Sequence, residues 1–215
     1  FVARLAGDAF AIVGQHDELG PASIRDCFAS PFVLMGIQQP LSVSAGVVHL
    51  NAGFRAGGEY LADAYLALKR AKASGLAQVV TFTADLANEV RSRARLLDDL
   101  RRAFQGRQLH LAYQPQIDLA SNRVVGVEAL LRWCQGYGTM VPPADFIPIA
   151  EQSGLIIDLG RWLLREGLQG LHRLRAAGVP DLRLAVNVSA IELRHPEFAS
   201  NVQTTLRDLA IPAAA

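Results

Sequence analysis

The chain has 215 residues, of which 51% are hydrophobic and 19% are charged, and its formal net charge is +1. This balance is typical of one large or two small soluble domains, and it excludes the strongly basic surface that a nucleic-acid polymer attracts. No apolar run approaches the roughly 20 residues that span a bilayer, and no signal peptide is recognisable, so we expect the chain in the cytoplasm.

The two ends of the chain predict that it belongs to a longer protein. The first residue is Phe1 instead of Met, and the last residues are Pro212, Ala213, Ala214 and Ala215. Attachment of that longer protein to the inner membrane, through regions outside this chain, therefore stays open.

The first part of the chain predicts a small α+β domain. Apolar runs at 1–5 and 10–13 flank Gly7-Asp8, which is the pattern of a β-hairpin and its turn. An Ala-, Leu- and Lys-rich segment at 59–74 ends before Gly75, a typical helix stop. The other elements expected in this part are a helix at 21–29 and strands at 32–37, 41–50 and 79–82.

A long helix is predicted at 85–104, because apolar residues recur there at helical spacing. These residues are Leu86, Val90, Leu97, Leu100 and Phe104. No Pro or Gly interrupts the pattern until Gly106. We interpret 84–106 as a helical linker that joins one domain at 1–83 to a second domain at 107–215.

Strands and helices alternate in the second domain, which predicts parallel β/α units. The expected strands lie at 109–114, 124–131 and 182–188, with a turn at 118–123 between the first two. The expected helices lie at 143–153, 158–177 and 196–209.

An ionisable side chain, Glu128, lies within the apolar, β-forming run at 124–130. A lone carboxylate is rare in such a run because burying an unpaired charge is costly. Side chains alternate between the two faces of a strand, so Glu128, Leu130 and Arg132 should share one face. This pattern indicates a site for a metal and a phosphate. The residues alone leave open that Glu128 is only a structural partner of Arg132.

Asn187 lies toward the end of the predicted strand at 182–188. Its parity is opposite to that of the apolar Leu184, Val186 and Val188, so its side chain should face away from the packed layer. Barrel enzymes place their sites at the carboxyl ends of strands, and hard cations such as Mg²⁺ or Mn²⁺ prefer oxygen ligands. The alternative is that Asn187 only caps the following turn.

Four segments of the second domain match the motifs of one family, in order and at similar spacing. They are Tyr113-Gln114-Pro115, Gly-Val-Glu-Ala-Leu-Leu-Arg-Trp at 126–133, Phe-Ile-Pro-Ile-Ala-Glu at 146–151, and Asn187-Val188-Ser189-Ala190. From about Leu96 onward the chain resembles the EAL domain, a family of cyclic di-GMP phosphodiesterases built on a modified (β/α)8 barrel. It departs from the family pattern at Gln135, Gly136 and Thr139, which fall in a loop where we expect little effect.

The resemblance implies a role for each matching residue. Glu128 would be the signature glutamate and a ligand of a divalent metal, Mg²⁺ or Mn²⁺, and Asn187 would be a second metal ligand. Both would thus be catalytic. Gln114, Leu130 and Arg132 would contact cyclic di-GMP, with Arg132 reaching a phosphate.

The resemblance also implies the reaction, which is hydrolysis of cyclic di-GMP to the linear dinucleotide at a two-metal site. The family's later carboxylates, its lysine and a further glutamate and glutamine are expected downstream of Ala215. The chain on its own is therefore expected to be inactive. Glu151 has either a role in the site or a structural role at a helix end.

The first domain carries a second, degenerate motif at residues 4–10, Arg-Leu-Ala-Gly-Asp-Ala-Phe. With 44–47 and 70–72, it resembles the C-terminal part of a GGDEF domain, the diguanylate cyclase fold. Ala9 replaces the signature glutamate and Ala6 its first glycine, whereas Gly7, Asp8 and Phe10 fill the other positions of the loop. Asp8 could still hold one metal, but an alanine cannot ligate a cation, so cyclase activity is not expected.

Together these resemblances predict the fold class: an α+β partial GGDEF domain followed by α/β, the first half of a modified (β/α)8 TIM-like barrel. The expected function is cyclic di-GMP hydrolysis by the longer protein, with the inactive GGDEF half as a regulatory module. The alternative is a non-catalytic cyclic di-GMP receptor or a protein-interaction scaffold. GTP binding at the degenerate half and a homodimer through the EAL domain also stay open.

Overall fold

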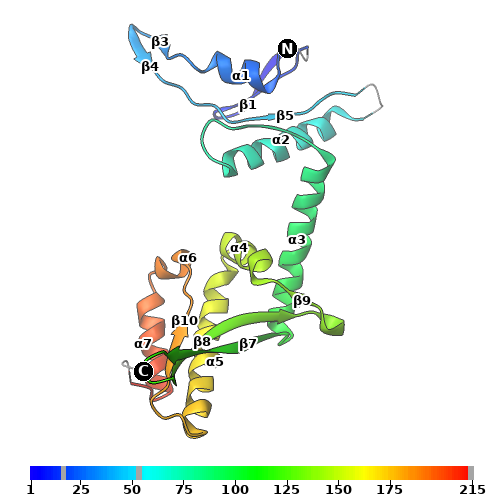
Figure 1. Cartoon of the computed structure of the whole chain (residues 1–215). Helices are drawn as coiled ribbons and strands as arrows, with labels where there is room; N and C mark the ends of the chain where they lie inside the picture. Colours follow the sequence, from blue (N-terminus) through cyan, green and yellow to red (C-terminus); the bar gives the residue numbers. More distant parts are fainter. Residues whose placement is uncertain (16–17, 52–54, 213–215) are drawn as a thin grey trace. The chain divides into compact units, whose positions relative to one another are not determined.

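The structure is a computed structural model that describes residues 1–15, 18–51 and 55–212, without the side chain of Tyr137. It divides into two compact units, Phe1–Ser92 and Arg93–Ala215, whose elements are labelled in Figure 1. The alanines that end the sequence lie outside the described residues. Within the described part of the chain, no helix is both long enough and apolar enough to cross a membrane.

Unit 1 begins with the β-hairpin that the sequence predicts. Strand β1 (Val2–Ala6) pairs antiparallel with β2 (Ala9–Ile12), and Arg4 lies opposite Phe10. Gly7 in the turn has a φ of +50°, a left-handed conformation that glycine adopts without the steric cost of a Cβ. The Arg4 guanidinium donates a hydrogen bond to the Gly7 carbonyl at 2.7 Å and lies 5.8 Å from the centre of the Phe10 ring.

A second hairpin replaces the single strand that was expected at 32–37. Strands β3 (Phe32–Leu34) and β4 (Ile37–Gln39) pair antiparallel through a turn at Met35 and Gly36, whose φ angles are +51° and +78°. Positive φ at both turn positions matches the twist of the adjoining strands. Turns of this kind usually have Asn, Asp or Gly at the first position. Because that position is a methionine here, the sequence does not predict the turn.

Unit 1 also contains a parallel pair, β5 (Ala45–Val47) with β6 (Val79–Thr81), and β5 is shorter than the strand expected at 41–50. A Cβ built on Gly46 of β5 would overlap the backbone of α2 at Ala64, which shows how closely this helix packs on the strand. The helices of unit 1 are α1 (Pro21–Cys27) and α2 (Gly57–Ala73).

Helix α3 is the predicted long helix and runs over Ala84–Gln105. It ends directly before Gly106, as the sequence pattern indicates. Its turns beyond Ser92 belong to unit 2, where Leu100 and Ala103 are part of the core.

Unit 2 contains a four-stranded sheet in the order β10-β8-β7, with β9 paired to the end of β8. Its strands are β7 (Leu109–Asp118), β8 (Arg123–Cys134), β9 (Met140–Val141) and β10 (Arg183–Val186). β8 and β10 are parallel, as predicted for the β/α units, whereas β7 and β8 are antiparallel, a direction that the sequence did not predict. The antiparallel direction follows from the short connection at 119–122, because a parallel crossover needs a dozen or more residues.

The helices of unit 2 are α4 (Pro143–Ser153), α5 (Leu155–Ala176), α6 (Ala190–Leu193) and α7 (Phe198–Asp208), with a 3-10 turn at Gly136–Gly138. Gly154 separates α4 from α5 with a φ of +77°, so α5 begins at once instead of at residue 158. The short α6 is an element that the sequence did not predict.

Helices α4 and α5 pack on one face of this sheet. In the core between them and the strands, Trp133 and Phe146 meet edge to face with ring centroids 5.6 Å apart. Helix α5 comes close to β7 at Gly170, where a Cβ would overlap the hydroxyl of Tyr113. The described residues of unit 2 thus form an open, mixed α/β sheet and not a closed barrel.

Candidate functional site

The two faces of the unit 2 sheet differ in the side chains they carry. On β8, Val127, Ala129, Leu131 and Trp133 are buried on the face that the helices cover. The residues between them point to the opposite face, because side chains alternate along a strand. That opposite face carries the predicted site residues Gln114, Glu128, Leu130 and Arg132.

The antiparallel register of β7 and β8 brings these residues together. Gln114 lies directly opposite Glu128, and His110 lies directly opposite Arg132. Directly opposed residues on one face have Cβ atoms about 4.5–5.5 Å apart. Gln114 is exposed, whereas Glu128, Leu130 and Arg132 are half-buried.

Asn187 joins this face from the other side of β8. Strand β10 ends at Val186, and Ala185 aligns with Glu128 in the parallel register, so Asn187 lies just past the carboxyl end of β10. Its Nδ2 donates a hydrogen bond to Oε1 of Glu128 at 2.6 Å. The structure therefore places both predicted metal ligands side by side, although they are far apart in the sequence.

The donor atoms at this point suit part of the shell of a hard cation. The hydrogen bond uses one oxygen of Glu128 and the amide nitrogen of Asn187, which leaves Oε2 of Glu128 and Oδ1 of Asn187 as oxygen donors. Within the described residues, no cluster of three or more His, Cys, Asp or Glu side chains could hold a metal. Glu128 and Asn187 would accordingly supply only some of the ligands.

Arg132 does not act as the structural partner of Glu128. Its Nη1 donates to the carbonyl of Leu131 at 3.0 Å, and none of the ion pairs among the described residues joins it to Glu128. The alternative that Glu128 is held as an ion pair by Arg132 is therefore not supported. A guanidinium on this face is a donor that suits a phosphate.

Sequence reasoning missed Glu192, a buried carboxylate in α6, the short helix that follows β10. Burial raises the pKa of the Glu192 carboxyl, hydrogen bonds from Ser189 lower it, and the nearby charge of Glu151 raises it further. The spacing of Ser189 and Glu192 is the signature of a capping box and could have indicated this contact. Glu151 lies near the end of α4.

The segment at 4–10, which resembles a degenerate GGDEF signature, lies in the first hairpin of unit 1. Ala6 ends β1, Gly7 and Asp8 form the turn, and Ala9 and Phe10 begin β2. The side chain of Asp8 is exposed, and Ala9 has no side-chain oxygen at the position where a GGDEF signature has its glutamate.

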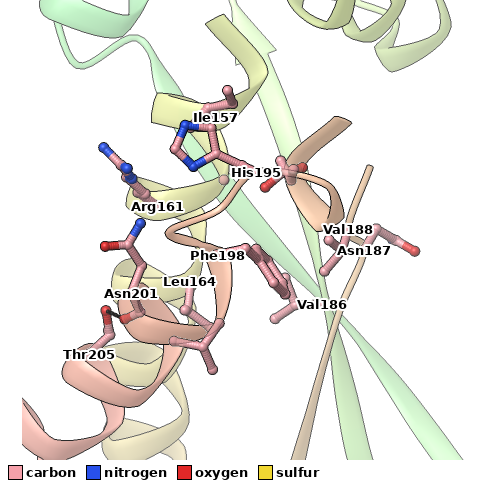
Figure 2. A pocket seen from close by; sticks show the side chains of 13 residues that line it. Ile157, Arg161, Leu164, Val186, Asn187, Val188, His195, Phe198, Asn201 and Thr205 are labelled. Atoms are coloured by element: carbon pink, nitrogen blue, oxygen red, sulfur yellow. Dashed lines mark hydrogen bonds between the residues drawn. The ribbon is translucent and has the colours of Figure 1, made fainter. Parts of the chain in front are cut away.

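Unit 2 also contains a cavity of about 260 Å³ between α5, α7 and the end of β10. Figure 2 shows Leu164, Val186 and Phe198 around it, whereas the side chain of Asn187 points away from it. This cavity is mostly apolar, and Asn187 and Glu192 are among the residues that line it.

Comparison with known proteins relates the chain to one family. A family model described as EAL domain matches residues 97–215. An uncharacterized signaling protein of Caulobacter vibrioides is 35% identical over 213 residues, which cover 96% of this chain and 26% of that protein. The bifunctional diguanylate cyclase/cyclic di-GMP phosphodiesterase MucR of Pseudomonas aeruginosa is 30% identical over 210 residues, which cover 95% and 31%. The chain thus spans about a quarter to a third of these relatives.

Solved structures support the same relation for the second half. The PaMucR phosphodiesterase in its c-di-GMP complex has a TM-score of 0.52 and 37% identity, over 54% of this chain and 47% of that one. The EAL enzyme Bd1971 in its cGMP-bound form has a TM-score of 0.52 and 27% identity, over 58% and 36%. Because the family model covers more than half of its residues, the chain belongs to the EAL domain family.

Proposed function

We propose that the protein carrying this chain hydrolyses cyclic di-GMP to the linear dinucleotide on the sheet face that carries Glu128. The observation that carries the proposal is the 2.6 Å hydrogen bond from Asn187 to Glu128, which gathers oxygen donors from two strands at one point. Family membership supports it, because the names of the relatives MucR and NbdA include cyclic di-GMP phosphodiesterase.

In this proposal Glu128 and Asn187 hold Mg²⁺ or Mn²⁺ through Oε2 and Oδ1, with further ligands from elsewhere in the protein. A divalent cation supplies Lewis-acid polarisation of a phosphate oxygen when it is bound. The hydrogen bond from Nδ2 of Asn187 keeps the Glu128 carboxylate oriented, so that its free oxygen stays directed to one place.

The substrate would lie across β7 and β8 on the same face. Arg132 would bind a phosphate of the dinucleotide, since a guanidinium forms strong, charge-assisted hydrogen bonds to phosphate oxygens. Gln114, opposite Glu128, offers both donors and acceptors, and Leu130 offers an apolar surface between the two polar residues.

Unit 1 would act as a regulatory module without cyclase activity, because Ala9 has no side-chain group that can ligate a cation. Its likeness to a GGDEF domain rests on the degenerate motif at 4–10 and on alignments with MucR and other relatives that extend over both units. GTP binding by this unit and a homodimer through the EAL domain belong to the same proposal.

The proposal is tested by hydrolysis of cyclic di-GMP with the protein expressed from its complete gene. We expect conversion to the linear dinucleotide that needs Mg²⁺ or Mn²⁺ and stops with a chelator. Glu128→Gln should lower kcat/KM by at least about 100-fold, since even residues that only support metal ligands cost 10–100-fold. Glu197→Gln, a change at an exposed glutamate paired with Arg161, is the matched control and should leave turnover unchanged.

Binding of cyclic di-GMP by the wild-type protein without any turnover would contradict the enzyme and favour the receptor. Binding of neither the dinucleotide nor a divalent cation would contradict both.

A further inference from the structure

Glu192 is a buried carboxylate to which the proposed reaction gives no role. Its side chain is 7% exposed, and among the described residues only Glu192 and Thr205 are buried polar or charged side chains. Burying a carboxylate is costly unless hydrogen bonds compensate for the loss of water. Specific contacts must therefore hold this side chain in place.

The first of these contacts is a reciprocal capping box with Ser189 at the start of α6. The backbone amide of Ser189 donates to Oε2 of Glu192 at 2.9 Å. In return, Oγ of Ser189 accepts from the amides of Ile191 and Glu192 at 3.2 and 3.3 Å. The box fixes the backbone of Ser189 relative to the first turn of α6.

The second contact is with α5 at Gly160, where the absence of a Cβ leaves room for the carboxylate. A Cβ built on Gly160 would overlap Oε1 of Glu192 and would lie 2.6 Å from its Cδ. The carboxylate therefore fits between the Ser189 amide and the surface of α5. Because α5 packs on β7, β8 and β10, this fit links the turn after β10 to the sheet.

Asn187 lies in that turn, two residues before Ser189 and directly after the last residue of β10. Asn187 is exposed, and the side chain of its neighbour Val188 is 46% exposed. Packing therefore restrains residues 187–188 little, so their position depends on the hydrogen bonds between Ser189 and Glu192.

We infer that Glu192 is a positioning residue: through Ser189 and the space at Gly160, it holds the turn that presents Asn187 to Glu128. The inference rests on the proposed role of Asn187 and Glu128 as metal ligands. Glu192 itself does not touch the metal or the substrate in this account.

The test uses Glu192→Ala, Glu192→Gln and Gly160→Ala in the protein expressed from its complete gene. Glu192→Ala should raise the Mn²⁺ concentration for half-maximal hydrolysis about tenfold, as loss of a group that supports a metal ligand does. The KM for cyclic di-GMP should not change, because the proposed substrate contacts Gln114 and Arg132 lie on β7 and β8 and not in the turn that Glu192 holds. Glu192→Gln should restore most of the Mn²⁺ affinity, since its amide oxygen can still accept from Ser189.

Gly160→Ala perturbs the same carboxylate from the side of α5 and carries the test if Glu192→Ala does not fold. Alanine is the better helix former, but its Cβ would crowd the Glu192 carboxylate, so a purely structural effect would lower the melting temperature and leave the Mn²⁺ requirement unchanged. We expect instead a raised Mn²⁺ requirement, in the same direction as with Glu192→Ala. Glu197→Gln, an exposed carboxylate in the same part of the chain, is the matched control and should have no effect.

A lower melting temperature with an unchanged Mn²⁺ requirement in both variants would overturn the inference. If the wild-type protein hydrolyses nothing, the proposed function fails, and the side-chain amide of Asn187 becomes the readout. It is followed by selective ¹⁵N labelling of asparagine and assigned with Asn187→Ala. Its resonance should shift in Glu192→Ala and stay in Glu192→Gln, and an unchanged resonance in Glu192→Ala would overturn the inference.

Discussion

Glu128 and Asn187 meet because each side chain follows the alternation of its own strand. The alternation of side chains along a strand is a local property, so the sequence could predict on which face of the sheet each residue lies. The hydrogen bond between them spans 59 positions and depends on the pairing of β8 with β10, which no local pattern contains. In the same way, the sequence could not decide whether Arg132 pairs with Glu128, and the structure shows that it does not.

For Glu192, the sequence contains a local signal for a capping box, but it does not show that the carboxylate is buried. Ser189 and Glu192 have the spacing of a capping box. The burial of the carboxylate, however, depends on the glycine at position 160 of a different helix. Packing between α5 and the turn after β10 can be recognised only in the folded chain.

The pKa of Glu192 leads to a prediction about stability. Burial is the main cause that raises this pKa above its ordinary value of 4.5. A raised pKa means that ionisation opposes folding, so the stabilisation is complete below the unfolded pKa and is lost as pH rises through the folded pKa. The glutamine of Glu192→Gln cannot ionise, so the variant should not lose stability as the pH rises.

Urea unfolding of the wild type and Glu192→Gln between pH 4 and pH 8 measures the effect. The free energy of unfolding of the variant, relative to the wild type, should increase as pH rises above about 4.5 and then level off. A difference that is the same at every pH would contradict the raised pKa.

At the scale of the elements, the antiparallel pairing of β7 and β8 brings Gln114 opposite Glu128. The turn that allows it contains Asp118, which accepts hydrogen bonds from the amide of Ala120 at 3.0 Å and the hydroxyl of Ser121 at 2.8 Å. The sequence predicted both strands and the turn at 118–123. It did not predict their direction, because the alternation of strands and helices elsewhere in the domain favoured parallel units.

Helix α5 holds β7 in place through a close fit that can be tested with Gly170→Ala. An added Cβ would overlap the hydroxyl of Tyr113 and lie 2.5 Å from its Cζ. We expect a loss of about 1–3 kcal/mol of stability from overpacking, although alanine is the better helix former.

A double-mutant cycle with Tyr113→Phe identifies the cause of that loss. The phenol donates to the carbonyl of Glu166 at 3.3 Å, so its removal has a cost of its own, which the cycle subtracts. Gly170→Ala should cost less in the Tyr113→Phe background, as measured by urea unfolding. Equal costs in both backgrounds would show that the hydroxyl is not the obstacle.

At the scale of the whole molecule, the two units differ in how much apolar surface they bury. Among the described residues, the buried apolar side chains of unit 1 are Ala67, Ala71 and Leu86, and all the others belong to unit 2. Sequence periodicity predicts which side of an element is apolar, but not whether anything covers that side. The sequence could therefore predict most helices and strands of unit 1, but not the small size of its core.

Glu128 and Asn187 are proposed to hold a divalent cation, and anomalous diffraction tests this claim most directly. Crystals of the protein expressed from its complete gene would be saturated with Mn²⁺ and measured at the manganese absorption edge. We predict an anomalous peak about 2.0–2.6 Å from a Glu128 carboxylate oxygen and from Oδ1 of Asn187, the range of bonds between hard cations and oxygen. Saturated crystals in which Asn187 still donates to Glu128 and no manganese lies beside either side chain would contradict the claim.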